Sequence, residues 1–121
     1  PILAMALLLG SLALFREAGG MDPLRQKSIL LTGFFEERVL ALENPNLTIL
    51  TPADPLRRGA QLSIRVADNS EAVFRSLLDL GMIVDYRRPD VIRAAPVPLY
   101  NRFRDVAEFC SALGDRAGSR L

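Results

Sequence analysis

The sequence predicts an α+β domain in which a mostly antiparallel sheet carries helices on one face. Along the 121 residues, apolar side chains recur first at helical spacing and then at the two-residue spacing of strands, which gives the order α-α-β-β-α-β-β-α. Hairpin-like links join the strands and the helices stand apart from them, which favours an antiparallel sheet. A chain of this length suits one domain.

The chain opens with an apolar run from Ile2 to Phe15 that only Gly10 and Ser11 interrupt. A helix that is apolar all round must be buried all round. The run is shorter than the ~18–20 residues needed to span a bilayer, and it lacks the basic start and cleavage site of a signal peptide. We therefore expect a buried interface helix. Because the chain also starts with Pro1 instead of methionine, we expect it to be a piece of a larger protein.

A second helix is predicted between breaks at residues 19–20 and 44–46. Asp22 suits its N-cap and Pro23 its first turn. We assign its charged residues, Lys27 among them, to the solvated side. Apolar residues at roughly helical spacing would form its buried side: Leu24, Ile29, Leu31, Phe35, Val39 and Leu42.

Two strands and a third helix are predicted next, the strands at residues 47–50 and 61–66. In the second strand apolar and polar residues alternate, so the two kinds of side chain point to opposite faces of the sheet. A cap among residues 68–70 starts the third helix, and Gly81 ends it. The alternating residues are Leu62, Ile64 and Val66 on one face and Ser63 and Arg65 on the other.

The last part of the chain predicts a hairpin and a helix. Strands at residues 82–85 and 91–95 would flank a turn at residues 87–90. The final helix would start near Asn101, and the tail at residues 114–121 is expected to fray.

The composition excludes several kinds of chemistry. Fifteen basic and fourteen acidic residues are scattered along the chain, so nothing predicts a nucleic-acid or membrane partner. There is no histidine, which removes Ser-His-Asp and Cys-His nucleophilic systems and histidine metal sites. Cys110 is the only cysteine, so no internal disulfide or zinc thiolate cluster is predicted, and a reducing cytoplasm is the expected compartment.

Arg93 is the most informative single residue, because it lies in the otherwise apolar strand at residues 91–95. Burying a guanidinium there is costly unless it meets an anion. From spacing alone, two partners remain open. One is structural, Asp85 or Asp90; the other is a substrate carboxylate, which fits the arginine fork bidentately.

The run I-R-A-A-P-V-P-L-Y at residues 92–100 resembles the C-terminal signature of kynureninases. The resemblance extends to K-S-x-x-L-T-G at residues 27–33, to R-G-A-Q-L at residues 58–62, and over nearly the whole chain to about Leu113. It implies the C-terminal small domain of a fold-type I pyridoxal-phosphate hydrolase of the aminotransferase class V group. Such enzymes cleave kynurenine, or its 3-hydroxy form, to anthranilate, or its 3-hydroxy form, and alanine.

The resemblance also implies where the functional groups lie. In this family the arginine at the position of Arg93 binds the substrate's α-carboxylate. The pyridoxal-phosphate lysine belongs to a large domain whose motifs are absent here, so no catalytic, cofactor or metal residue is predicted in this chain. Residues 1–43 would connect to that domain, residues 46–113 would form the small domain, and residues 114–121 a tail. The parent enzyme is expected to be a cytoplasmic homodimer of tryptophan catabolism or NAD biosynthesis.

Five other residues receive structural interpretations. Lys27 is the only lysine, but its position mid-helix argues against a Schiff-base role. Cys110 behaves as a small core residue. The Arg57-Arg58 pair is read as surface charge and not as a phosphate site. Tyr100 is expected to anchor the start of the last helix.

Two other functions remain open on the sequence. One is a related class V enzyme, such as a desulfurase, which also uses a carboxylate-binding arginine. The residues upstream of this segment would separate it from a kynureninase. The other is a free-standing binding domain that keeps the arginine without the chemistry.

Overall fold

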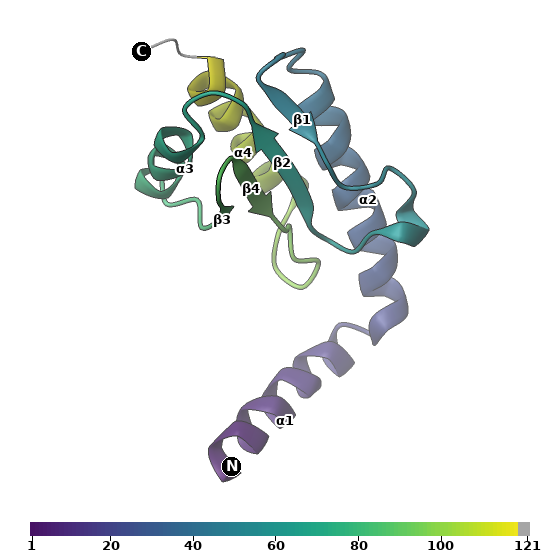
Figure 1. Cartoon of the computed structure of the whole chain (residues 1–121). Coiled ribbons are helices and arrows are strands. Elements are labelled where there is room, and N and C mark those ends of the chain that lie inside the picture. Colours follow the sequence, from purple (N-terminus) through teal and green to yellow (C-terminus); the bar gives the residue numbers. More distant parts are fainter. Residues whose placement is uncertain (119–121) are drawn as a thin grey trace.

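The computed structural model describes residues 1–118 and has the predicted α+β fold (Figure 1). Its order of helices and strands agrees with the sequence pattern, with one additional 3-10 turn in the loop between the first two strands. The elements are α1 (Ile2–Glu17), α2 (Met21–Leu40), β1 (Leu47–Ile49), η1 (Pro55–Arg57), β2 (Leu62–Val66), α3 (Ser70–Asp79), β3 (Asp85–Arg87), β4 (Val91–Ala94) and α4 (Phe103–Gly118).

The four strands form one antiparallel sheet in the order β1-β2-β4-β3. Ile64 of β2 lies opposite Ile92 of β4, and Ser63 lies opposite Arg93. Opposed residues of an antiparallel pair point to the same face. The alternation predicted for β2 therefore continues across the sheet and separates an apolar face from a polar one.

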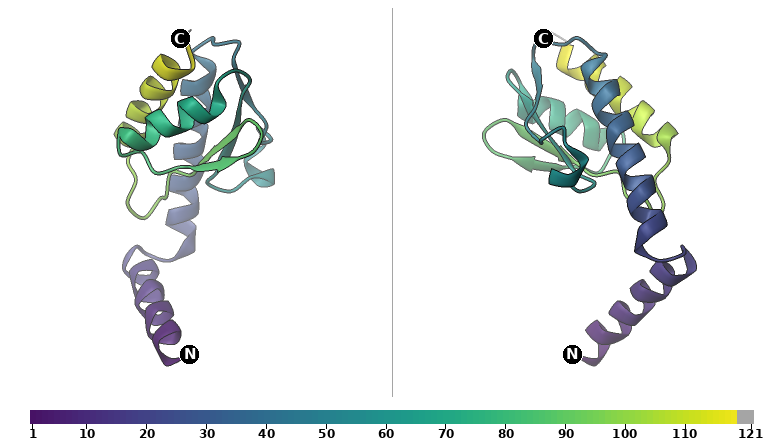
Figure 2. Two further views of the ribbon diagram at one scale, coloured as in Figure 1. Left: turned by 60° about the vertical axis from the view of Figure 1, so that its left-hand side comes forward. Right: turned by 90° about the vertical axis from the view of Figure 1, so that its right-hand side faces the viewer.

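Helices α2, α3 and α4 all lie against the apolar face (Figure 2). Phe35 of α2 meets Phe109 of α4 edge to face, and Phe74 of α3 stacks on Tyr86 of β3. This confirms that the helices cover one side of the sheet. The core consists of Leu31, Phe35, Val39, Leu62, Ile64, Val66, Val73, Leu77, Ile92, Ala94, Val106, Phe109, Cys110, Leu113 and Ala117.

Three predicted boundaries were wrong. Helix α2 begins at Met21 after two glycines with positive φ, so Asp22 lies in its first turn and is not the N-cap. Strand β3 is Asp85–Arg87 and not residues 82–85, because the turn closes within residues 88–90 and Arg87 pairs with Val91. The tail does not fray at residue 114: α4 continues to Gly118, while residues 119–121 lie outside the described part.

The end of α4 stays ordered because its apolar side remains in contact with the core. Ala117 is buried, and its backbone carbonyl accepts a hydrogen bond of 3.1 Å from Asn46 Nδ2. Asn46 Oδ1 accepts a hydrogen bond of 2.6 Å from the backbone N–H of Asp68. One asparagine thus joins three segments that are far apart in the sequence.

Helix α1 projects away from the rest of the domain (Figure 1). None of its residues is buried, and Ile2, Leu3 and Leu7 are 86%, 81% and 76% exposed. Single soluble domains rarely expose an apolar surface of this extent.

Within residues 1–118, no helix by itself is long and apolar enough to cross a membrane. Only α1 and α2 taken together meet the length and composition required, with a bend of 78° between them.

We predict that the isolated 121-residue chain self-associates, because none of the residues of α1 is buried by the rest of residues 1–118. Sedimentation velocity at several concentrations measures this. A chain beginning at Met21 is the matched control and should associate less. A full chain that stays monomeric at every concentration would contradict the expectation.

Candidate functional site

The sheet face opposite the helices carries the predicted functional residue. Among residues 1–118, no helix covers this face (Figure 2). The strand pairing places Ser63, Arg93 and Asp85 side by side across β2, β4 and β3. In the next row Arg65 lies opposite Val91, which lies opposite Arg87. The face is therefore polar and rich in arginine.

Arg93 is held by Asp85, its direct cross-strand neighbour. Its Nε donates to Asp85 Oδ2 at 2.6 Å, and its Nη2 forms an ion pair with the same oxygen. The Arg93 side chain is 30% exposed and that of Asp85 is 50% exposed. Asp90, the other partner considered, instead accepts from Arg65 Nε at 2.7 Å. Of the two structural partners considered, Asp85 is therefore the one that holds Arg93.

The ion pair lowers the pKa of Asp85 below its ordinary value, chiefly through the hydrogen bond from Arg93 and further through Arg87. A carboxyl group with a lowered pKa favours the folded state above its unfolded pKa and loses this contribution as the pH falls through the folded value. Asp85 is therefore a carboxylate throughout the neutral range, and the contact with Arg93 persists there.

One edge of the Arg93 guanidinium remains available for an anion. A guanidinium has five N–H donors, arranged as a side-on edge at Nε and Nη2 and an end-on edge at Nη1 and Nη2. Within residues 1–118, the hydrogen bonds and ion pairs of Arg93 go to Asp85 through the side-on edge. The end-on edge can therefore take a second carboxylate.

The loop that follows β4 is fixed from two sides. Lys27 Nζ donates to the Pro98 carbonyl at 2.7 Å, and Asn101 Oδ1 accepts from the Val97 N–H at 2.7 Å. The assignment of Lys27 to the solvated side was wrong, because it is partly buried against this loop. Lys27 and Pro98 lie 71 residues apart, so local spacing gave no sign of the contact.

Tyr100 does not anchor the last helix, since its side chain is 70% exposed. The start of α4 is fixed by Asp105, whose carboxylate accepts from the Arg102 N–H at 2.8 Å. This hydrogen bond is the main reason why the pKa of Asp105 is lowered. A carboxylate in the first turn also interacts favourably with the helix dipole.

The reading of Arg58 as surface charge was wrong. Its side chain is only 4% exposed, and its Nη1 pairs with Glu36 Oε2 of α2 at 2.8 Å. Arg25 of α2 donates to the Arg58 carbonyl at 3.1 Å. Arg58 thus ties the loop between β1 and β2 to α2. Arg57 is exposed, as expected.

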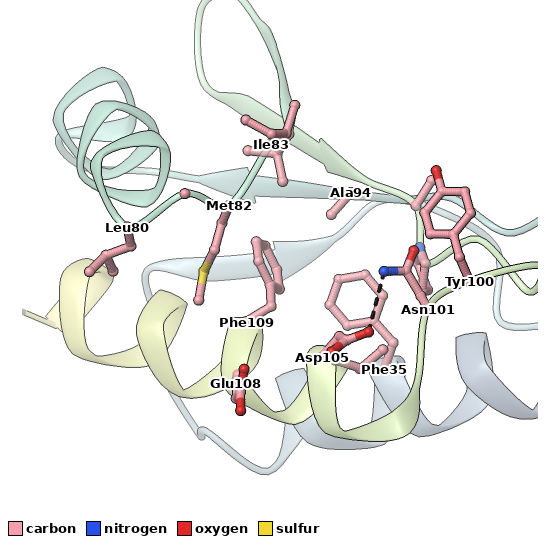
Figure 3. Close-up of a pocket in the computed structure, with 15 residues that line it drawn as sticks. Phe35, Leu80, Met82, Ile83, Ala94, Tyr100, Asn101, Asp105, Glu108 and Phe109 are labelled. Atoms are coloured by element: carbon pink, nitrogen blue, oxygen red, sulfur yellow. Dashed lines mark hydrogen bonds between the residues drawn. The ribbon is translucent and has the colours of Figure 1, made fainter.

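A cavity of about 610 Å³ opens beside the start of α4 and was not foreseen (Figure 3). Its walls are mainly apolar, and its charged lining residues are Asp105 and Glu108. With two carboxylates and no basic residue in its lining, it does not suit an anionic ligand. Arg93 is not among its lining residues. Ile83, one of its lining residues, is 87% exposed.

Two features of the described residues bear on metal and cofactor binding. No group of three or more metal-binding side chains occurs within residues 1–118. Lys27, the only lysine of the chain, directs its amine to the Pro98 carbonyl. The Lys27 amine is therefore engaged in a hydrogen bond with the backbone.

Comparison with known proteins defines an enzyme-derived α+β domain. A family model described as "Kynureninase C-terminal domain" matches residues 24–113. A kynureninase of Stenotrophomonas maltophilia is 49% identical over 121 residues, which cover 98% of this chain and 28% of the relative. A kynureninase of Xanthomonas euvesicatoria pv. vesicatoria is 53% identical over 112 residues, which cover 90% of this chain and 26% of the relative.

The chain belongs to the kynureninase C-terminal domain family. It spans about a quarter of the length of the curated relatives it matches. The resemblance seen in the sequence motifs is confirmed.

We predict that the isolated chain forms no aldimine with pyridoxal phosphate. The Lys27 amine is engaged by Pro98, and it lies among partly buried residues. The visible spectrum and the mass after borohydride reduction measure adduct formation, and a Lys27→Arg chain controls for reaction at the N-terminus. A stoichiometric adduct on Lys27 would overturn the prediction.

We also predict that Cys110 is unreactive in the folded chain. Burial raises the pKa of its thiol to about 12, so the thiolate is scarce at pH 8 and becomes abundant only as the pH approaches that value. Alkylation by iodoacetamide, followed by mass, should be roughly a hundredfold or more slower than after unfolding. Equal rates in the folded and unfolded chain would show that the thiol is accessible.

Proposed function

We propose that this chain is the C-terminal part of a kynureninase, in which Arg93 binds the α-carboxylate of the substrate. The parent enzyme would hydrolyse L-kynurenine or 3-hydroxykynurenine to the corresponding anthranilate and L-alanine. Membership of the family and the names of the relatives support the enzyme class. The observation that carries the residue assignment is the end-on edge of Arg93, which is left open on the uncovered face of the sheet.

Arginine suits this task for geometric reasons. Its planar fork matches both oxygens of a carboxylate, so a bidentate contact fixes the direction of the bound molecule as well as its position. Fixing an amino acid through its carboxylate restricts the orientation of the bonds at its α- and β-carbons. Such positioning is a recognised contribution to catalysis.

The cofactor in this proposal is pyridoxal 5′-phosphate, held by the part of the parent outside these residues, where it supplies the electron sink. The contribution of this chain is to bring Arg93 to the substrate. Strand β4 is held between β2 and β3, and the loop after it is tied to α2 by Lys27. These contacts keep the backbone of Arg93 in place.

We further propose that residues 1–43 connect this domain to the large domain and that residues 46–113 form the small domain. The exposed apolar surface of α1 supports this, because the family model begins at Leu24, after α1 has ended. Leu24 is also the first residue of α2 that is buried in this domain. The surface covering α1 would then belong to the large domain.

The wider setting is proposed on the family alone. The parent would act in the cytoplasm as a homodimer, in tryptophan catabolism or NAD biosynthesis. A free-standing domain without catalysis is the second candidate, and activity of the complete protein separates the two.

We predict that Arg93→Ala in the complete enzyme lowers kcat/KM for kynurenine roughly a hundredfold or more. Losing a charge-assisted bidentate contact and leaving the substrate carboxylate unpaired typically costs ~2–5 kcal/mol. Arg93→Lys should recover only part of the loss, since an ammonium cannot reproduce the fork. Steady-state kinetics and cofactor absorbance are the measurements, and the absorbance should hardly change.

Arg65→Ala is the matched control for this experiment. Arg65 lies on the same face of the sheet and pairs with Asp90, so its removal tests for a general effect of charge on this face. Near-normal kcat/KM in Arg93→Ala would mean that Arg93 serves only the structural pair with Asp85.

A further inference from the structure

We propose that Asp85 is a positioning residue for Arg93. By binding the side-on edge of the Arg93 guanidinium, Asp85 turns its end-on edge toward the substrate carboxylate. This inference rests on the proposed function of Arg93. Asp85 itself does not touch the substrate in this scheme, and it acts through the arginine.

The strand register places the two residues for this role. Asp85 of β3 and Arg93 of β4 are directly paired, so their side chains leave the same face of the sheet as immediate neighbours. A free arginine side chain samples many rotamers, so ordering it when the substrate binds has an entropic cost. A carboxylate on the neighbouring strand orders the side chain before the substrate arrives.

The atoms in contact determine which edge is left open. Both Nε and Nη2 of Arg93 reach the same oxygen, Asp85 Oδ2. Nε occurs only on the side-on edge, so this contact fixes the plane and the rotation of the guanidinium. Nη1 and the second hydrogen of Nη2 then point along the end-on edge, where two donors can meet two carboxylate oxygens.

The charge of the cluster also favours an incoming anion. Arg87 Nε donates to Asp85 Oδ2 at 2.9 Å, so two guanidinium groups share one carboxylate. Asp85 therefore orients Arg93 without cancelling the positive charge of the cluster.

The same face of the sheet contains a matched control pair. Arg65 Nε and Asp90 Oδ2 lie 2.7 Å apart and form a second arginine–aspartate contact. Asp90 accepts from Arg65, whereas the side-chain contacts of Arg93 among residues 1–118 go to Asp85, so the removal of Asp90 leaves the proposed orientation unchanged.

The test compares Asp85→Ala, Asp85→Asn and Asp90→Ala in the complete enzyme. Two substrates are used, kynurenine and its α-carboxamide, which lacks the carboxylate charge. We expect Asp85→Ala to lower kcat/KM for kynurenine about tenfold, mainly by raising KM, as for the loss of a hydrogen bond between charged groups. Asp85→Asn keeps an acceptor oxygen and should recover part of the loss. Asp90→Ala should match the unmodified enzyme.

Two further readouts separate positioning from a merely structural role. The α-carboxamide should react at nearly the same rate with Asp85→Ala as with the unmodified enzyme, because it does not need the oriented fork. Asp85→Ala should also add nothing to the effect of Arg93→Ala, since two residues that act as a unit are not additive.

The outcomes distinguish this inference from the proposed function. If Arg93→Ala impairs kynurenine cleavage and Asp85→Ala does not, Asp85 has no positioning role while the function of Arg93 stands. Equal losses with both substrates would also overturn the inference, since they indicate structural damage. Near-normal activity of Arg93→Ala would overturn both proposals. Should Asp85→Ala fail to fold, Asp85→Asn decides by the same comparisons.

Discussion

The two-residue alternation of β2 and β4 is the constraint on which the rest of this domain depends. Ile64 and Ile92 face each other under the helices, so Ser63 and Arg93 must face each other on the opposite side. A shift of one residue in the register would bury the guanidinium and expose the core. The stability of the core and the presentation of Arg93 therefore rest on one pairing. The charged Arg93 is tolerated in this strand because its side chain lies on the face that the helices do not cover.

Helix α2 joins this sheet to its two neighbouring loops. Its apolar side chains pack on the apolar face of the sheet, and its polar side chains contact the two loops. Arg25 and Glu36 hold the loop between β1 and β2, because Arg25 donates to the Arg58 carbonyl and Glu36 pairs with the Arg58 side chain. Lys27 holds the loop after β4. Buried or partly buried contacts of this kind restrict loops that would otherwise move freely. The loop that follows Arg93 is thus held by Lys27, a residue that the sequence pattern assigned to the solvated side.

Helix α1 has the opposite character, because nothing in the described residues covers it. The relative from Stenotrophomonas maltophilia matches nearly the whole chain, α1 included, whereas the match to the family model of the C-terminal domain begins at Leu24. Residues before Leu24 are therefore part of a kynureninase-like sequence without being part of this compact domain. An exposed apolar helix in that situation agrees with the proposed contact between residues 1–43 and the large domain of the parent.

The sequence by itself determined the fold class, the alternation of the strands, the core role of Cys110 and the prominence of Arg93 as a cation in an apolar strand. Local patterns suffice for these, because each depends on neighbours along the chain. Only the tertiary structure decided that Asp85 and not Asp90 holds Arg93, since the choice depends on where the turn between β3 and β4 closes. It also decided the partners of Lys27 and Arg58, because contacts across tens of residues leave no periodic signal in the sequence.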